Sequence, residues 1–188
     1  QKSGLYSPEY EHDACGVGFV AHMKGEKSHA IIQMALTTLN HLEHRGACGC
    51  EENTGDGAGI LMQIPHEFFA KVCGNDFNLP PKGEYGTGLV FLPQDARERT
   101  FCKGVFRKVL EKENSVLLGW REVPVDDSDI GVSAKETKPV IEQIFIAKGL
   151  LRPHRRARND EEDDLAFERS LYVIRKKAEN AVRGSGIK

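Results

Sequence analysis

The stretch "DACGVGFV", residues 13–20, places a cysteine directly before a glycine-rich, apolar run. Apolar side chains alternate along residues 16–22, and this period of two predicts a β-strand there. Cys15 can be a nucleophile, because Gly16 and Gly18 leave room for a substrate to approach the backbone closely. A structural cysteine that packs as a small hydrophobe at the start of a strand explains the same pattern. The spacing by itself leaves both interpretations open.

Length and charge limit the class of protein. The chain has 188 residues, of which 39% are hydrophobic and 29% are charged, so we expect a globular domain with a substantial core. Lys and Arg number 26 against 28 Asp and Glu, which gives a net charge of -2. This balance disfavours nucleic acid or an anionic membrane as the main partner. No apolar run approaches the ~20 residues that a membrane-spanning helix needs, so we expect no membrane partner.

The cysteines are few, odd in number and widely spaced. They are Cys15, Cys48, Cys50, Cys73 and Cys102. A disulfide framework is typical of shorter, cysteine-dense chains, so we expect free thiols and a reducing compartment. One glycine separates Cys48 from Cys50, whereas a structural zinc site needs a second pair of ligands. We therefore expect no metal site in this chain.

Periodicity and turn residues predict a mixture of helices and strands. The expected helices cover 29–44, 65–74, 95–114 and 164–184, and the expected strands cover 16–22, 60–64, 85–93, 115–124 and 138–149. Ser28 is the expected cap of the first helix, and residues 45–59 form a glycine-rich loop. The side chains expected to face the core are Ile31, Ala35, Leu39 and Leu42 in the first helix, Phe101, Val105 and Val109 in the third, and Leu165, Leu171, Ile174, Ala178 and Val182 in the last.

The mixture of helices and strands indicates an α/β or α+β domain. The charged segment 152–164 is basic and then acidic, and because the acids neutralise the basic half we interpret it as a solvated loop. The last helix ends only a few residues before the end of the sequence. We therefore expect the domain to be incomplete at its C-terminus.

Arg45 opens the glycine-rich loop and is the second candidate for chemistry. Its guanidinium can grip a carboxylate through two hydrogen bonds, and Gly55, Gly57 and Gly59 can present backbone N–H groups to an anion. The "GDGAG" segment lacks the Lys-Ser/Thr of a phosphate-binding loop, which argues against a nucleotide site. A long turn that follows a helix-terminal arginine is the plain alternative.

Two motifs together resemble a known family. They are "CGVGFVAHMKGE", residues 15–26, and "HRGACGCEENTGDGAGILMQIPHEFF", residues 44–69. The combination resembles the amino-terminal glutaminase domain of glutamate synthase large subunits. That domain is a class II glutamine amidotransferase of the N-terminal nucleophile hydrolase superfamily. Amidotransferases for purines or aminosugars share the cysteine and an arginine but not this loop. The resemblance implies the fold class α+β, in the form of an αββα sandwich. It also implies residues 1–14 as a propeptide or leader and 15–188 as the N-terminal part of the glutaminase domain.

The resemblance also implies a mechanism. Once residues 1–14 are removed, the α-amine of Cys15 becomes a base with an ordinary pKa near 8, able to take the thiol proton. Cys15 then attacks the side-chain amide of glutamine, ammonia leaves, and water hydrolyses the glutamyl thioester to glutamate. Arg45 holds the α-carboxylate of glutamine. While Ala14 remains bonded to Cys15, that nitrogen is an amide and the chain is an inactive precursor.

The remaining implications concern the longer enzyme. In that family the ammonia reacts with 2-oxoglutarate in a domain that carries FMN, and an iron–sulfur cluster is also implied; neither cofactor is expected in this chain. The expected partners are glutamine, the remaining domains and a small reductase subunit, in the cytoplasm or the plastid stroma.

The family's oxyanion hole uses an Asn-Gly pair, which neither "EENTG" nor "KENS" supplies. Each donor of such a hole is commonly worth ~10²–10³ in rate. We therefore expect this fragment alone to be inactive. The alternatives are a non-catalytic interaction module and another class II amidotransferase.

Overall fold

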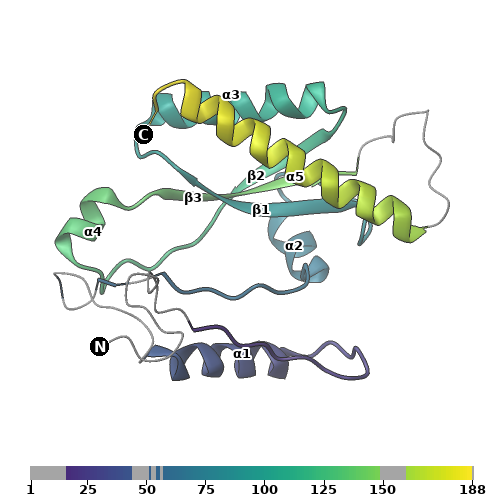
Figure 1. Ribbon diagram of the computed structural model, residues 1–188, viewed down its shortest axis with the longest axis vertical. Helices are drawn as coiled ribbons and strands as arrows, with labels where there is room; N and C mark the ends of the chain where they lie inside the picture. The colour runs from purple at the N-terminus through teal and green to yellow at the C-terminus, as the bar shows by residue number, and fades with distance from the viewer. Residues whose placement is uncertain (1–15, 44–50, 52–53, 56, 149–159, 188) are drawn as a thin grey trace, which may run out of the picture. The chain divides into compact units, whose positions relative to one another are not determined.

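The computed structural model describes residues 16–43, 51, 54–55, 57–148 and 160–187 (Figure 1). The chain divides into two compact units. The first contains residues 1–63 and 126–137, and the second contains residues 64–125 and 138–188. Each unit is described by itself.

A three-stranded antiparallel sheet forms the centre of the second unit. Its strands are β1 (Tyr85–Leu92), β2 (Val116–Glu122) and β3 (Val140–Ala147), in the order β1-β3-β2. The β1–β3 register runs from Tyr85 opposite Ala147 to Leu92 opposite Val140. Because β3 lies in the middle of the sheet, its side chains are buried on both faces, and Phe145 is 0% exposed. These three strands confirm the expected strands at 85–93, 115–124 and 138–149.

Two helices cover one face of this sheet. They are α3 (Ala96–Lys112) and α5 (Asp160–Gly184), which lie together on the same side in Figure 1. Their apolar stripes pack on alternate side chains of β3. The resulting core consists of Val109, Leu110, Ile144, Ile146, Ile174 and Ala178, with Trp120 and Leu171 packed against it.

The opposite face carries a smaller, aromatic core beneath α2 (His66–Cys73). Phe145 is its centre: its ring meets Phe69 edge to face at a centroid distance of 5.2 Å and Phe77 at 5.3 Å. Aromatic pairs in such tilted geometries stabilise the fold beyond the contribution of their buried apolar surface. Pro65 precedes α2 and Gly74 follows it, so the expected helix at 65–74 is confirmed to within one residue at each end.

Local capping fixes the ends of α3. The Asp95 carboxylate accepts hydrogen bonds from the backbone N–H groups of Arg97 and Glu98, both at 2.9 Å. At the other end Asn114 adopts a left-handed conformation with φ of 54°, and Ser115 N–H donates to the Leu110 carbonyl at 2.9 Å. Asparagine tolerates this conformation better than most residues do. The expected helix at 95–114 is therefore confirmed to within two residues.

The first unit contains α1 (His29–His41) and the short α4 (Val132–Thr137). Ser28 occupies the N-cap position of α1 as expected, but its side chain makes no capping hydrogen bond. A turn precedes α1: Gly25 has φ of 70°, and its N–H donates to the His22 carbonyl at 2.9 Å. The sequence analysis did not predict α4, whose six residues are too few to show an apolar period.

Two expected strands are absent. Residues 16–22 and 60–64 are extended but belong to no strand, and Val17 and Phe19 are 92% and 93% exposed. Alternating apolar residues show only that an extended segment would have one apolar face. A β-strand also needs a neighbouring strand for its backbone hydrogen bonds, and without one it is not stable in water. No strand among the described residues pairs with either segment.

Three further expectations were wrong. Phe101 and Leu165 are 46% and 56% exposed, although both were expected to face the core. In α5 the buried stripe instead begins at Phe167, and two residues along a helix turn the side chain to nearly the opposite face. The charged segment 152–164 is not all loop, because α5 begins at Asp160.

The coarse fold class, α+β, is confirmed by the mixture of helices with an antiparallel sheet. Within the part of the chain that the structure describes, no helix has the length and apolar character needed to cross a membrane.

Candidate functional site

The two residues singled out for chemistry, Cys15 and Arg45, lie outside the described residues, as do Cys48 and Cys50. The structure therefore does not test whether Cys15 and Arg45 come together. It describes the segments that flank them in sequence. These are residues 16–22, which follow Cys15, and Glu51, Thr54, Gly55 and residues 57–59 of the glycine-rich loop.

Gly18, three residues after Cys15, packs tightly against helix α1. A Cβ atom built on Gly18 would lie 2.8 Å from Thr38 Cγ2, closer than such atoms approach in proteins. The absent side chain therefore allows the extended segment to lie on α1. This packing role explains Gly18 without a substrate, whereas substrate approach beside Gly16 stays a prediction.

Glu51 lies within the glycine-rich loop, and the sequence analysis missed it. Its carboxylate accepts hydrogen bonds from Ser133 N–H at 3.1 Å, Ser133 Oγ at 2.8 Å and Thr54 Oγ1 at 3.1 Å. These bonds, first of all that from the Ser133 backbone, lower the pKa of Glu51 below its usual value. Glu51 thus ties the loop to the start of α4, 82 residues further along the chain.

Gly131 makes room for this contact. A Cβ atom at Gly131 would overlap the Glu51 carboxylate and would lie 2.7 Å from Thr54 Oγ1. Local sequence patterns gave no signal for this arrangement, because the partners are far apart in the chain. The one available hint was an acidic residue inside a loop otherwise rich in glycine.

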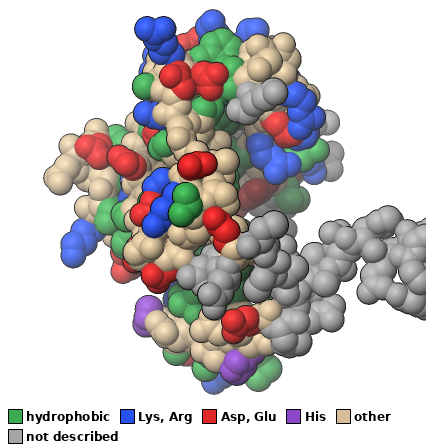
Figure 2. All heavy atoms as spheres, turned by 90° about the vertical axis from the view of Figure 1, so that its left-hand side faces the viewer, with side chains coloured by type: hydrophobic (Ala, Val, Ile, Leu, Met, Phe, Trp, Pro, Cys, Tyr) green, Lys and Arg blue, Asp and Glu red, His purple; other side chains and the backbone are tan. Residues whose placement is uncertain are grey.

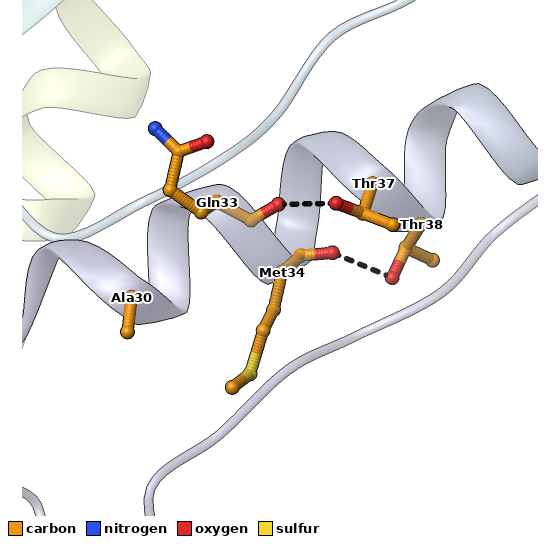
Figure 3. A pocket seen from close by; sticks show the side chains of 5 residues that line it. All are labelled: Ala30, Gln33, Met34, Thr37 and Thr38. Atoms are coloured by element: carbon orange, nitrogen blue, oxygen red, sulfur yellow. Dashed lines mark hydrogen bonds between the residues drawn. The ribbon is translucent and has the colours of Figure 1, made fainter.

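A shallow hollow lies along α1, lined by Ala30, Gln33, Met34, Thr37 and Thr38 (Figure 3). The hydroxyls of Thr37 and Thr38 donate to the carbonyls of Gln33 and Met34, at 2.9 and 2.8 Å. Their donor hydrogens are thus used within the helix. None of these five side chains is charged, so they cannot form an ion pair with a charged substrate.

The two described cysteines do not form a metal site. Cys73 in α2 and Cys102 in α3 are free and buried, and they belong to helices on opposite faces of the sheet. Burial raises the pKa of both thiols, which disfavours the thiolate needed for metal binding or attack. Among the described residues no group of three or more His, Cys, Asp or Glu side chains is placed to hold a metal ion.

Charged side chains are mixed on the face shown in Figure 2, where basic and acidic groups alternate without a broad patch of one sign. The ion pairs of the second unit agree with this mixture. Lys148 contacts Asp163 and Asp164, and Lys177 contacts Glu113.

Comparison with known proteins assigns the family. Residues 15–187 match the family described as "Glutamine amidotransferases class-II". The chain is 48% identical over 177 residues to the "Glutamate synthase [NADPH] large chain" of Bacillus subtilis, covering 94% of this chain and 11% of the relative.

Two further relatives are also glutamate synthases. The chain is 41% identical over 174 residues to "Ferredoxin-dependent glutamate synthase 1, chloroplastic/mitochondrial" of Arabidopsis thaliana, covering 92% of this chain and 10% of the relative. It is also 41% identical over 183 residues to "Glutamate synthase [NADH]" of Saccharomyces cerevisiae, covering 94% of this chain and 8% of the relative. The chain thus spans about a tenth of the length of these relatives. It belongs to the class II glutamine amidotransferases, in the group formed by the amidotransferase domains of glutamate synthases.

Proposed function

We propose that this chain hydrolyses glutamine to glutamate and ammonia, with Cys15 as the nucleophile. The observation that carries the proposal is the family match, which begins at Cys15 and extends to residue 187. The 48% identity to a glutamate synthase large chain supports the choice of this group over amidotransferases with other ammonia acceptors.

The chemistry starts at the amino terminus of residue 15. We place residues 1–14 as a leader whose removal gives Cys15 a free α-amine. This amine takes the thiol proton, and the sulfur attacks the amide carbon of the glutamine side chain. The C–N bond breaks, the nitrogen takes a proton from the amine and leaves as ammonia, and a glutamyl thioester remains. Water then attacks the thioester, releasing glutamate and restoring the thiol.

Arg45 is the proposed anchor of the substrate. A guanidinium binds the α-carboxylate of glutamine through two parallel hydrogen bonds, which fixes orientation as well as charge. Binding the α-carboxylate in this way holds the amide carbon of glutamine near the sulfur of Cys15. Holding reacting atoms in position can supply much of the rate enhancement of an enzyme.

The complete fold that we propose is the αββα sandwich of N-terminal nucleophile hydrolases. The sheet of the second unit, which carries α3 and α5 on one face, supports this proposal, because a sandwich of this kind has a helix layer on a sheet layer. Residues 16–22 and 60–64, extended but unpaired, are candidates for strands of the other sheet. In that arrangement their exposed apolar side chains become part of the core.

In the whole protein we propose that the ammonia reacts with 2-oxoglutarate to form glutamate, an oxidoreductase reaction that uses FMN and an iron–sulfur cluster. The names of the relatives include NADPH, NADH and ferredoxin dependence, which supports such a redox partner. Cys73 and Cys102 do not fit as ligands of a cluster, because they lie on opposite faces of the sheet. We place both cofactors in further domains of the whole protein, with a small reductase subunit as partner and the cytoplasm or plastid stroma as location.

A glutamine-mimicking diazo-ketone tests the assignment, because it alkylates an activated nucleophile that binds glutamine. The natural protein with a free amine on Cys15 is compared with a form that retains residues 1–14 and with Cys15→Ala. We expect covalent labelling at Cys15 in the first alone, located by peptide mass spectrometry. Absence of labelling in the first form would overturn the proposal and favour a non-catalytic interaction module. Fragment 15–188 is treated in parallel, and we expect it not to hydrolyse glutamine.

A further inference from the structure

We infer that Arg121 is the anchor of a carboxylate-binding site on the face of the sheet that carries α2. The site consists of Arg121, the buried Gln143, the ring of Phe68 and exposed apolar side chains of the same face. All of these residues belong to the second unit, so the inference uses neither Cys15 nor any other residue of the first unit.

The aromatic core beneath α2 covers only part of this face. In β3 the side chains of Phe145, Gln143 and Ile141 point to it, because they alternate with those that pack under α3 and α5. Phe145 is covered by α2. Leu89 of β1 lies opposite Gln143 and is 56% exposed. Phe91 lies opposite Ile141 and is 65% exposed. Beyond Phe145 the face therefore presents apolar side chains at the surface.

Arg121 of β2 lies on this face, beside Gln143. Its Nη1 donates a hydrogen bond to Gln143 Oε1 at 3.3 Å, and its guanidinium carbon lies 5.7 Å from the centre of the Phe68 ring. Gln143 is only 8% exposed, so the surrounding core holds its amide in place. These two contacts orient the guanidinium and leave several of its N–H donors for a ligand.

No carboxylate among the described residues forms an ion pair with Arg121. Lys148, also partly buried, does pair with Asp163. Glu122 follows Arg121 in the chain, but it lies opposite Glu142 and therefore on the other face of the sheet. A partly buried guanidinium without an anion favours a carboxylate from outside the unit, which it can bind through two parallel hydrogen bonds.

The neighbours of Arg121 select the rest of the ligand. The next row of the face contains Val123, Ile141 and Phe91, and the Val123 N–H donates to the Ile141 carbonyl at 3.0 Å. Neither this row nor that of Arg121 contains a second cation. A second carboxylate would lie against Leu89 or Phe91 and lose hydration without gaining an ion pair. The site therefore favours a small monocarboxylate with a hydrocarbon chain over a dicarboxylate.

Phenylglyoxal, which modifies arginine side chains, tests the inference on the whole natural protein with hexanoate as the probe. Peptide mass spectrometry gives the modification rate of each arginine separately, so binding at Arg45 does not enter the readout for Arg121. We expect hexanoate to slow the modification of Arg121 in a saturable way, with half-protection at roughly millimolar concentration. Arg97, an exposed arginine of α3, is the internal control, and its rate should not change.

Two related probes test the class of ligand. Hexanamide has the same chain without the charge, and glutarate has a second carboxylate. Each should need a concentration roughly tenfold higher than hexanoate for half-protection of Arg121, the loss typical of a hydrogen bond to a charged group. Equal protection by hexanamide would overturn the role of the charge, and stronger protection by glutarate would overturn the choice of a monocarboxylate.

Variants test the two contacts that orient the guanidinium. Gln143→Leu and Phe68→Ala should both raise the hexanoate concentration for half-protection, the former roughly tenfold. Phe101→Ala is the matched control for Phe68→Ala, because Phe101 is an aromatic residue of similar exposure in α3, on the other face of the sheet. If Gln143→Leu fails to fold, the comparison of Phe68→Ala with Phe101→Ala decides.

An Arg121 that is modified equally fast with and without hexanoate would overturn the inference. An Arg121 that phenylglyoxal does not modify in either case would also overturn it, since another group of the protein would then occupy the guanidinium. Labelling of Cys15 by the diazo-ketone tests the proposed function separately, and neither result of that experiment changes the meaning of Arg121 protection.

Discussion

The aromatic ring of Phe77 lies directly on the backbone of Gly119 in β2. The strand register shifts between Leu117 and Gly119, and the same ring packs against Phe145 at a centroid distance of 5.3 Å. A Cβ atom at Gly119 would overlap the Phe77 ring. The lack of a side chain at position 119 therefore allows the aromatic core beneath α2 to reach the sheet.

Gly119→Ala is expected to destabilise the protein by about 1–3 kcal/mol, the usual effect of overpacking a core. The added methyl group forces Phe77 away from both the strand and Phe145. Chemical denaturation with urea measures the change. Gly88→Ala is the matched control: Gly88 also lies in a strand but has open space around its Cβ position, so its unfolding free energy should hardly change. Equal effects of the two substitutions would contradict the packing argument.

The ion pair between Lys103 and Glu142 supports the other face of the sheet. Lys103 Nζ lies 2.5 Å from Glu142 Oε2 and 5.3 Å from the centre of the Trp120 ring. Glu142 is only 7% exposed. Lys103→Met should therefore lower the unfolding free energy by about 1–3 kcal/mol, because it leaves a buried carboxylate without its partner.

A double variant distinguishes the effect of an unpaired buried charge on stability from the effect of lost side-chain packing. Lys103→Met/Glu142→Leu removes both charges, and replacing a whole buried pair is often neutral or stabilising. We expect its unfolding free energy to recover most of the loss seen in Lys103→Met. If the double variant were less stable than Lys103→Met, the charge argument would be wrong.

Lys148 links the end of β3 to the start of α5. Its side-chain Nζ contacts Asp163 and lies 3.0 Å from Asp164 Oδ1. Its backbone N–H donates a hydrogen bond to the Glu84 carbonyl at 2.7 Å. The hydrogen bond to Asp163 is the largest cause that raises the pKa of Lys148. Lys148→Met should lower the unfolding free energy at neutral pH by about 1–3 kcal/mol.

The pH dependence of this effect has a defined sign. Because the folded state raises the pKa of Lys148, its stabilising effect is complete below the ordinary lysine pKa and is lost as pH rises through the raised value. The stability difference between wild type and Lys148→Met should therefore be constant near neutral pH and shrink in strong alkali. Lys108→Met, at an exposed position of α3, should show no comparable difference. A difference that grows in alkali would contradict this assignment.

Cys73 and Cys102 should resist alkylation in the native protein. Their exposed fractions are 1% and 3%, and burial raises the pKa of both thiols, so little thiolate is available. Treatment with iodoacetamide, followed by peptide mass spectrometry, should leave both unmodified until denaturant is added. Rapid native labelling of either thiol would show that its helix opens readily.

Local patterns predicted much of the second unit. Alternation and helical period predicted the three paired strands and three helices, and the structure confirms these elements. These signals suffice because capping and amphipathic periods act over a few residues. The motifs at 15–26 and 44–69 also indicated the family, which the comparisons confirm.

Contacts between residues far apart in the sequence decided which strands pair and where the chain packs closely. Residues 16–22 and 60–64 have the composition of strands, but pairing depends on a neighbour that a local pattern does not contain. The roles of Cys15 and Arg45 stay predictions, since both residues lie outside the described part. The Glu51–Ser133 contact joins residues 82 positions apart, and the Phe77–Gly119 contact depends on a missing side chain. The sequence by itself thus determined the family and most local elements, whereas the tertiary structure decided which strands pair, because pairing and close packing depend on residues that only the folded chain brings together.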